Sequence, residues 1–121
     1  MAVQRIAICG WPGTGKTTLA ERLALETGLP LRSTDGVEWH EASGIVAGWM
    51  YAPEWIIEGV AVPRALRRYR ELHPGEPAPV DRLIYCEKIW RELSPRAIGM
   101  GRGMDGILYS MGGWLPPLER P

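Results

Sequence analysis

The segment from Gly10 to Thr17 combines the residue types that a phosphate-binding loop needs; it reads Gly-Trp-Pro-Gly-Thr-Gly-Lys-Thr. Glycines let such a loop wrap closely around an anion, so that several backbone N–H groups point inward. Lys16 would reach the β- and γ-phosphates as a point charge, and the Thr17 hydroxyl could ligate magnesium. The spacing therefore predicts a site for ATP with Mg²⁺. The residues predicted to form it are Gly10, Trp11, Pro12, Gly13, Thr14, Gly15, Lys16, Thr17 and Thr18.

Acidic residues at the ends of predicted strands would decide what happens to the bound nucleotide. Glu58 follows Ile56-Ile57, a pattern expected of a residue that holds Mg²⁺ directly or through water; the alternative is a solvated strand-end carboxylate. Asp35 could accept a proton from a substrate hydroxyl or hydrogen-bond to it. The alternative is that Asp35 caps a helix or forms a turn before Gly36. Glu87 is expected to be structural, pairing with Lys88 or with a nearby arginine.

Arginines would serve in two places, one gripping the acceptor and one stabilising charge on the transferred group. Arg64 begins the helix predicted after the third strand and is the candidate for the first role. Arg96 and Arg102 lie in a glycine-rich segment that could close over the phosphates, so they are candidates for the second. The alternative for Arg96 and Arg102 is a solvated surface position, which is the commoner use of arginine. The predicted catalytic residues are Lys16, Asp35, Glu58, Arg64 and Arg102, and the predicted metal ligands are Thr17 and Glu58.

Two tryptophans, Trp39 and Trp49, lie in the segment 36–54, which shows no clear hydrophobic period. Their rings could stack a nucleotide base, although core packing is the commoner use of such residues. Ser43 could cap a short helix within this segment. This segment is expected to select the acceptor. Because it has no readable pattern, the sequence does not predict which molecule the acceptor is.

The rest of the sequence supplies the elements that would position these side chains. The apolar patterns predict strands at 3–9, 29–33, 55–59 and 82–86, and helices at 16–27 and 63–72. A looser helix is expected through residues 107–111, after a cap-like Ser94-Pro95 pair and before Gly112-Gly113. The alternation is typical of a three-layer α/β domain with a parallel sheet, whose ligands lie outside the carboxyl ends of the strands. Four strands are clear and a fifth is not identified, so we expect one domain over 1–113 and a proline-rich C-terminal tail over 114–121.

The composition narrows the function classes. The chain has 121 residues, and its 14 basic residues balance its 14 acidic residues, so no global field attracts nucleic acid or a membrane surface. A nucleic-acid substrate is therefore not expected, although arginines cluster at positions 64, 67, 68 and 70. The two cysteines, Cys9 and Cys86, fit a reduced setting better than a disulfide framework. With no signal segment and no membrane-length apolar run, a cytoplasmic location is expected.

On these residues, the chain resembles the small P-loop kinases of the adenylate kinase and shikimate kinase type. It is most similar to the short kinase-like ATPases encoded in bacterial and phage genomes. The resemblance rests on Gly10–Thr17, Ser33–Asp35, the run 55–59 leading to Pro63-Arg64, and the segment 95–103. It implies a five-stranded parallel sheet, an acceptor site between strands two and three, and an arginine-bearing lid. It also implies that Asp35 sits at the acceptor.

These observations predict an ATP-dependent kinase that transfers the γ-phosphate to a nucleotide-like or other small-molecule acceptor. The chain is shorter than a full nucleotide kinase, and no lid insertion of the usual length is identified in it. An alternative prediction is therefore a nucleotide-binding module or slow ATPase that acts as a switch in a larger assembly. The base preference and the oligomeric state are left open by the sequence.

Overall fold

The computed structural model describes residues 4–121, so Val3, which the predicted first strand includes, lies outside the described residues. Strands and helices alternate along the chain, as the sequence predicts. The elements in order are β1 (Arg5–Gly10), α1 (Lys16–Thr27), β2 (Leu31–Ser33), α2 (Ala42–Trp49), β3 (Trp55–Glu58), α3 (Val62–Leu72), β4 (Arg82–Cys86), α4 (Pro95–Met111), a 3₁₀ turn (Gly112–Trp114) and β5 (Leu118–Glu119).

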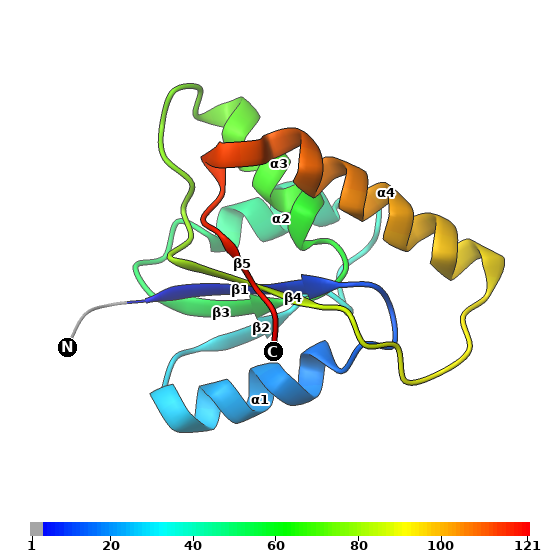
Figure 1. The fold of residues 1–121 in the computed structure, drawn as a ribbon. Coiled ribbons are helices and arrows are strands. Elements are labelled where there is room, and N and C mark those ends of the chain that lie inside the picture. Colours follow the sequence, from blue (N-terminus) through cyan, green and yellow to red (C-terminus); the bar gives the residue numbers. More distant parts are fainter. Residues whose placement is uncertain (1–3) are drawn as a thin grey trace.

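The strands form one parallel sheet in the order β2-β3-β1-β4-β5. Helix α1 covers one face of this sheet, and α2, α3 and α4 lie on the other face (Figure 1). The predicted three-layer α/β architecture is therefore confirmed. Because all strands run the same way, the segments that follow β1, β2, β3 and β4 meet at one edge of the sheet.

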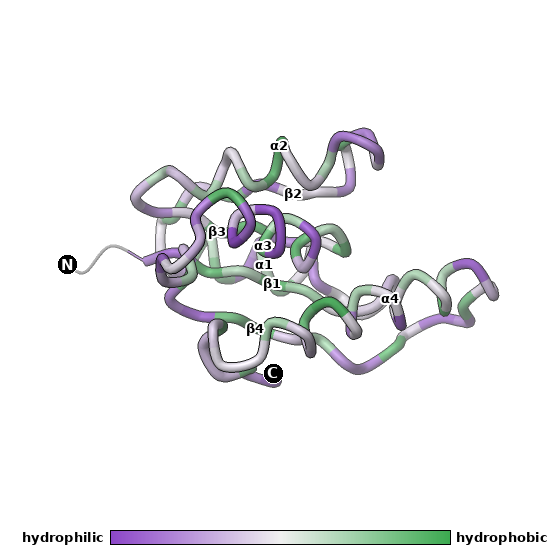
Figure 2. The backbone as a smooth tube through the Cα atoms, turned by 90° about the horizontal axis from the view of Figure 1, so that it is seen from above, coloured by the Kyte–Doolittle hydropathy of each residue, from purple (hydrophilic) through white to green (hydrophobic). Residues whose placement is uncertain are grey.

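Alternate residues of the central strand β1 build the two halves of the core. Ile6 and Ile8 pack with Ala20 of α1 on one face. Ala7 and Cys9 pack on the other face with residues of α2, α3 and α4. A strand that is buried on both faces reads as a continuous apolar run, which is why the sequence alone identifies it. In Figure 2 the hydrophobic colours accordingly gather on the central strands, while the connecting loops are largely hydrophilic.

The fifth strand, which the sequence pattern does not locate, is Leu118–Glu119, inside the segment expected to be a proline-rich tail. Leu118 pairs in register with Leu83, and Glu119 pairs with Ile84. A bidentate contact between Arg82 and Glu119 supports this pairing. A strand of two residues between prolines has no measurable hydrophobic period, so only its long-range partners identify it.

The helix ends differ from expectation at one place and agree at another. Helix α2 begins after Glu41, and Ser43 lies within its first turn, so the prediction that Ser43 caps this helix is wrong. Ser94 does cap α4, because its hydroxyl accepts the backbone N–H of Ala97 at 3.1 Å. Helix α4 is longer than expected and projects beyond the sheet at the edge where the loops meet (Figure 2). Within residues 4–121, no helix combines the length and apolarity that crossing a membrane requires.

Candidate functional site

The loop between β1 and α1 has the conformation that the sequence pattern demands. Gly10 has φ +140°, and a Cβ atom there would lie 2.3 Å from the carbonyl oxygen of Cys86 on β4. Gly13 and Gly15 have φ near +76° and +79°, a region that side-chain-bearing residues rarely adopt. The loop thus turns tightly against β4 before α1 begins.

Lys16 is held inside this loop. Its ammonium donates to the carbonyl oxygen of Trp11 at 2.7 Å and to Oγ1 of Thr14 at 3.3 Å. The side chain is 7% exposed, and burial lowers the pKa of Lys16, while the nearby carboxylates of Glu58 and Asp35 oppose that shift. An ammonium has three N–H donors, so two bonds within the loop leave one for a phosphate oxygen.

Thr17 and Glu58 meet across the loop. The Thr17 hydroxyl donates to Oε1 of Glu58 at 3.1 Å, and Glu58 is 1% exposed. The other carboxylate oxygen, Oε2, is buried and has no hydrogen-bond partner among residues 4–121. A buried carboxylate oxygen without a partner is costly unless a cation or water satisfies it. The hydroxyl and the carboxylate are oxygen donors of the kind that Mg²⁺ prefers.

The predicted acids lie beside one another because β2 and β3 are adjacent. The backbone N–H of Thr34 donates to the carbonyl of Glu58 at 2.9 Å, which holds the ends of the two strands together. Asp35 follows Thr34 directly and lines a hollow of about 430 Å³ over the loop. We call this cavity the phosphate hollow. Its lining residues are Pro12, Gly13, Thr14, Gly15, Lys16, Thr17, Asp35, Val60, Arg91 and Met100.

Arg91 is a site residue that the sequence reasoning missed. It lies in the connection 87–94 between β4 and α4, and a Cβ atom on Gly13 would come within 2.8 Å of its Nε. The backbone N–H of Trp90 donates to the carbonyl of Gly13 at 3.0 Å, which anchors this connection on the loop. Its position in the chain could have indicated this placement, because Arg91 follows β4, the strand beside β1, and the ends of these two strands lie at the same edge of the sheet.

The arginines chosen from the sequence lie elsewhere. Arg64 donates to the carbonyl of Trp39 at 3.2 Å and its guanidinium lies 4.5 Å from the centre of that indole, outside the lining of the phosphate hollow. Arg96 and Arg102 are exposed along α4 and do not line the hollow either. The structure therefore brings together Lys16, Thr17, Asp35 and Glu58, but it does not add Arg64 or Arg102 to them.

A second hollow, of about 580 Å³, lies on the α1 side of the loop. The indole Nε1 of Trp90 would lie 3.5 Å from a Cβ on Gly15, so this ring borders the loop directly. Thr18, one of the predicted nucleotide contacts, lines this hollow together with Leu19 and Arg22. The exposed ring of Trp90 offers a face for stacking. Trp39 and Trp49, the two tryptophans considered from the sequence for this role, make other contacts.

Trp49 packs against the hydrophobic core, with the guanidinium of Arg32 5.1 Å from its ring centre. Trp39 is the ring that Arg64 covers. Glu87 forms an ion pair with Arg120 at 2.5 Å, so its expected pairing with an arginine is confirmed, with a partner from the C-terminal segment.

Comparison with known proteins supports this reading of the fold. Residues 6–68, just over half of the chain, match the model of the ATPase family associated with various cellular activities (AAA). No curated protein matches the sequence.

Solved structures share the fold at low sequence identity. A gluconokinase from Sinorhizobium meliloti is 14% identical with a TM-score of 0.55, over 98% of this chain and 82% of the other. A shikimate kinase from Acinetobacter baumannii in complex with shikimate is 14% identical with a TM-score of 0.58, over 92% and 81%. A sugar kinase from Janibacter is 17% identical with a TM-score of 0.50, over 98% and 83%. The predicted resemblance to small P-loop kinases is confirmed, whereas a special likeness to phage-encoded members stays a prediction.

Proposed function

Since the chain belongs to the ATPase family associated with various cellular activities, we propose that it is a small kinase that binds ATP with Mg²⁺ and phosphorylates a small-molecule acceptor. The observation that carries this proposal is the phosphate hollow. Lys16, Thr17, Asp35 and Arg91 line it together, so a lysine, a hydroxyl, a carboxylate and a guanidinium face one space. A loop that only bound nucleotide would not need an acid and an arginine facing the same space.

Each group has a distinct task in this proposal. The loop N–H groups and Lys16 hold the β- and γ-phosphates, and Thr17 with Glu58 would hold Mg²⁺. The metal would neutralise charge on the β- and γ-oxygens. Oε2 of Glu58 supports this assignment, because this buried carboxylate oxygen has no hydrogen-bond donor in the described part of the chain, residues 4–121.

Asp35 is the proposed group at the acceptor. It would accept the proton of an acceptor hydroxyl, or hydrogen-bond to that hydroxyl, while the acceptor oxygen bonds to the γ-phosphorus and the bond to the ADP oxygen breaks. Where the acceptor is itself a phosphate, no proton transfer is needed and Asp35 orients the acceptor. Arg91 would stabilise the charge on the transferred group, in place of the exposed Arg102.

The nucleoside and the acceptor are proposed to occupy opposite sides of the loop. The hollow bordered by Trp90 and lined by Thr18 would take the nucleoside, with its base stacked on the indole. The acceptor would approach from the side of Asp35, and the Arg64 guanidinium, which contacts Trp39, is proposed to bind an anionic group of the acceptor.

An assay of acceptor-dependent ADP release tests this proposal. Purified protein is given ATP and Mg²⁺ with a panel of sugars, hydroxy acids and nucleoside monophosphates. We expect at least one acceptor to raise ADP release above the rate with ATP alone, and the rise to vanish in Asp35→Asn. If no acceptor raises the rate, the kinase proposal fails.

A second candidate, a slow ATPase or nucleotide-dependent switch, is favoured by one observation. Arg91 and Trp90 are exposed on the short connection 87–94. Within residues 4–121, no lid segment longer than this connection covers the hollow. This candidate predicts tight ATP binding, little turnover and a nucleotide-dependent change in assembly. Size measurement with and without ATP distinguishes it, because a kinase of the first kind keeps one size and turns over with its acceptor.

A further inference from the structure

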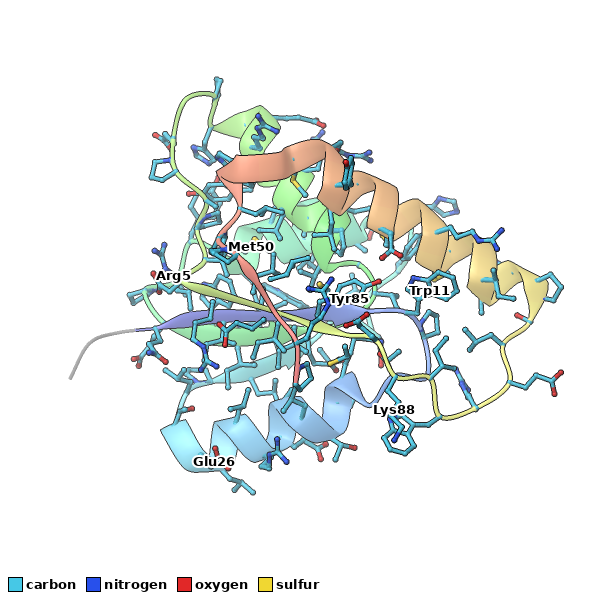
Figure 3. The ribbon with its side chains drawn as sticks, viewed as in Figure 1. Arg5, Trp11, Glu26, Met50, Tyr85 and Lys88 are labelled. Atoms are coloured by element: carbon cyan, nitrogen blue, oxygen red, sulfur yellow. The ribbon has the colours of Figure 1, made fainter. Side chains whose placement is uncertain are left out.

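Helix α4 contacts the phosphate loop at the indole of Trp11. Figure 3 shows Trp11 beneath α4, on the side of the sheet where Tyr85 also lies. Two residues of α4 meet this indole, Gly101 and Asp105. They are four positions apart and therefore lie on the same face of the helix.

Asp105 joins three elements. Its Oδ2 accepts the indole N–H of Trp11 at 2.7 Å, and its Oδ1 accepts the hydroxyl of Tyr85 on β4 at 2.5 Å. Burial and this hydrogen bond raise the pKa of Tyr85, so the phenol stays a donor at neutral pH. Hydrogen bonds to an ionised acceptor are about twice as strong as neutral ones. One carboxylate thus fixes α4 on both the central sheet and the loop.

Gly101 makes the close approach possible. A Cβ atom at this position would lie 2.3 Å from Cδ2 of the Trp11 ring, so no larger residue fits without displacing the indole. Helix α4 contains three further glycines, Gly99, Gly103 and Gly106, and a Cβ at any of them would meet no atom of the described residues within 4 Å. The fit between helix and indole is therefore specific to Gly101 rather than a general consequence of a glycine-rich helix.

The backbone of Trp11 connects this helix contact to Lys16. The carbonyl oxygen of this residue accepts both Lys16 Nζ and Thr14 Oγ1, each at 2.7 Å. The indole held by α4 and the carbonyl held by Lys16 belong to the same residue. A shift of the indole would therefore move the oxygen that sets the position of the ammonium.

We propose that Asp105 is a positioning residue for the nucleotide site. By holding the Trp11 indole against Gly101, it fixes the Trp11 carbonyl, and so it keeps Lys16 where it meets phosphate. This inference rests on the proposed nucleotide binding, but it does not depend on phosphoryl transfer.

A double-mutant cycle on ADP affinity tests the proposal, with Mg²⁺ present and binding measured by calorimetry. Trp11→Phe removes the indole N–H and keeps a ring on Gly101, and Asp105→Asn removes the charge and keeps the shape. Each single variant is expected to bind ADP about five- to tenfold more weakly, within the range for losing one hydrogen bond of ordinary strength. The double variant is expected to be no weaker than the weaker single variant, because both substitutions act on the same contact between Trp11 and Asp105.

Glycine variants of α4 supply the matched control and a second route. Gly103→Ala should leave ADP affinity unchanged and raise the melting temperature, because alanine favours a helix and meets open space there. Gly101→Ala should weaken ADP binding, because its Cβ displaces the indole. This pair keeps the proposal testable if Trp11→Phe or Asp105→Asn fails to fold.

Two results would overturn the inference: ADP affinity that is unchanged in Asp105→Asn despite a lower melting temperature, or losses that add fully in the double variant. Either would reduce Asp105 to a structural contact. A protein that binds ADP normally but phosphorylates no acceptor would refute the proposed kinase and leave this inference intact. A wild-type protein that binds no ADP would overturn both.

Discussion

Thr17 donates a hydrogen bond of 3.1 Å to Glu58, which links the first turn of α1 to the end of β3. The two side chains come from segments far apart in the sequence, and the parallel pairing of β1 with β3 brings them together. Within residues 4–121, Oε2 of Glu58 is buried and accepts no hydrogen bond. The proposed Mg²⁺ site would therefore connect the end of β3 to the loop.

Glu58→Gln is expected to weaken the Mg²⁺-dependent part of ATP binding by about tenfold or more, the usual cost of altering a residue that orients or ligates a metal. An amide has the same shape but carries no charge, so Mg²⁺ loses a ligand or its orienting partner. Calorimetry with and without Mg²⁺ measures the effect, and Thr17→Ser, which keeps the hydroxyl, is the control. Equal Mg²⁺ dependence in Glu58→Gln and the wild type would refute the assignment.

Arg91→Ala is expected to lower acceptor-dependent turnover by about a thousandfold, the scale seen when an arginine that stabilises a transferred phosphoryl group is removed. Arg91→Lys should recover little of this activity, because an ammonium lacks the planar fork of donors. The exposed Arg68 on α3 offers a control variant, Arg68→Ala. If Arg102→Ala costs more activity than Arg91→Ala, the assignment made from the sequence is correct and the one made from the structure is wrong.

The contrast between Lys16 and Arg91 explains how far the sequence could predict the site. Gly10 to Lys16 form a continuous segment, so their spacing alone encodes the loop and the helix that follows. The positions of Asp35 and Glu58 could also be predicted, because each residue follows or ends a recognisable strand and the carboxyl ends of parallel strands lie at the same edge of a sheet. Arg91 lies in a connection without periodicity, and only the folded path of 87–94 over Gly13 distinguishes it from Arg102.

The same limit applies to the fold. Helix α1 and strands β1, β3 and β4 have apolar patterns long enough to be read locally. Strand β5 is identified only by its pairing with β4, and Asp105 only by its contacts with Trp11 and Tyr85. These contacts depend on the chain returning to the sheet from α4, which local propensity does not encode.

ATP affinity is expected to fall as the pH rises toward 10.5, the ordinary pKa of lysine, because burial lowers the pKa of Lys16 below that value. Bound phosphate favours the charged ammonium and so raises the lysine pKa in the complex. Affinity is therefore fully present below the pKa of Lys16 in the free protein and is lost as the pH rises from there through the higher Lys16 pKa of the complex. The nearby Cys9 thiol, whose pKa burial raises to about 12, does not titrate in this range.

Calorimetry in buffers of different ionisation enthalpy checks this linkage. It should detect net proton uptake on ATP binding at alkaline pH, and the uptake should vanish in Lys16→Met together with most of the affinity. Proton release, or uptake that persists in Lys16→Met, would show that another group is responsible.

The contact between Arg82 and Glu119 is expected to hold β5 on the sheet in a pH-dependent way. The guanidinium donates two hydrogen bonds, at 3.0 and 2.8 Å, and these bonds lower the pKa of Glu119 below its ordinary 4.5. Because the folded-state pKa is lowered, this stabilisation is fully present above pH 4.5 and is lost as the pH falls through the folded-state value. Both side chains are more than a third exposed, so the gain is small, about 0.5 kcal/mol.

Hydrogen exchange at Leu118 and Glu119 measures this local stability better than global unfolding does, because a two-residue edge strand opens on its own. Exchange, corrected for the intrinsic effect of pH, should speed up as the pH falls below 4.5 in the wild type. Glu119→Gln should exchange faster at neutral pH and lose the pH dependence, and Arg82→Gln should behave like it. Should Glu119→Gln retain wild-type protection at neutral pH, backbone pairing with Leu83 and Ile84 would be sufficient to hold β5.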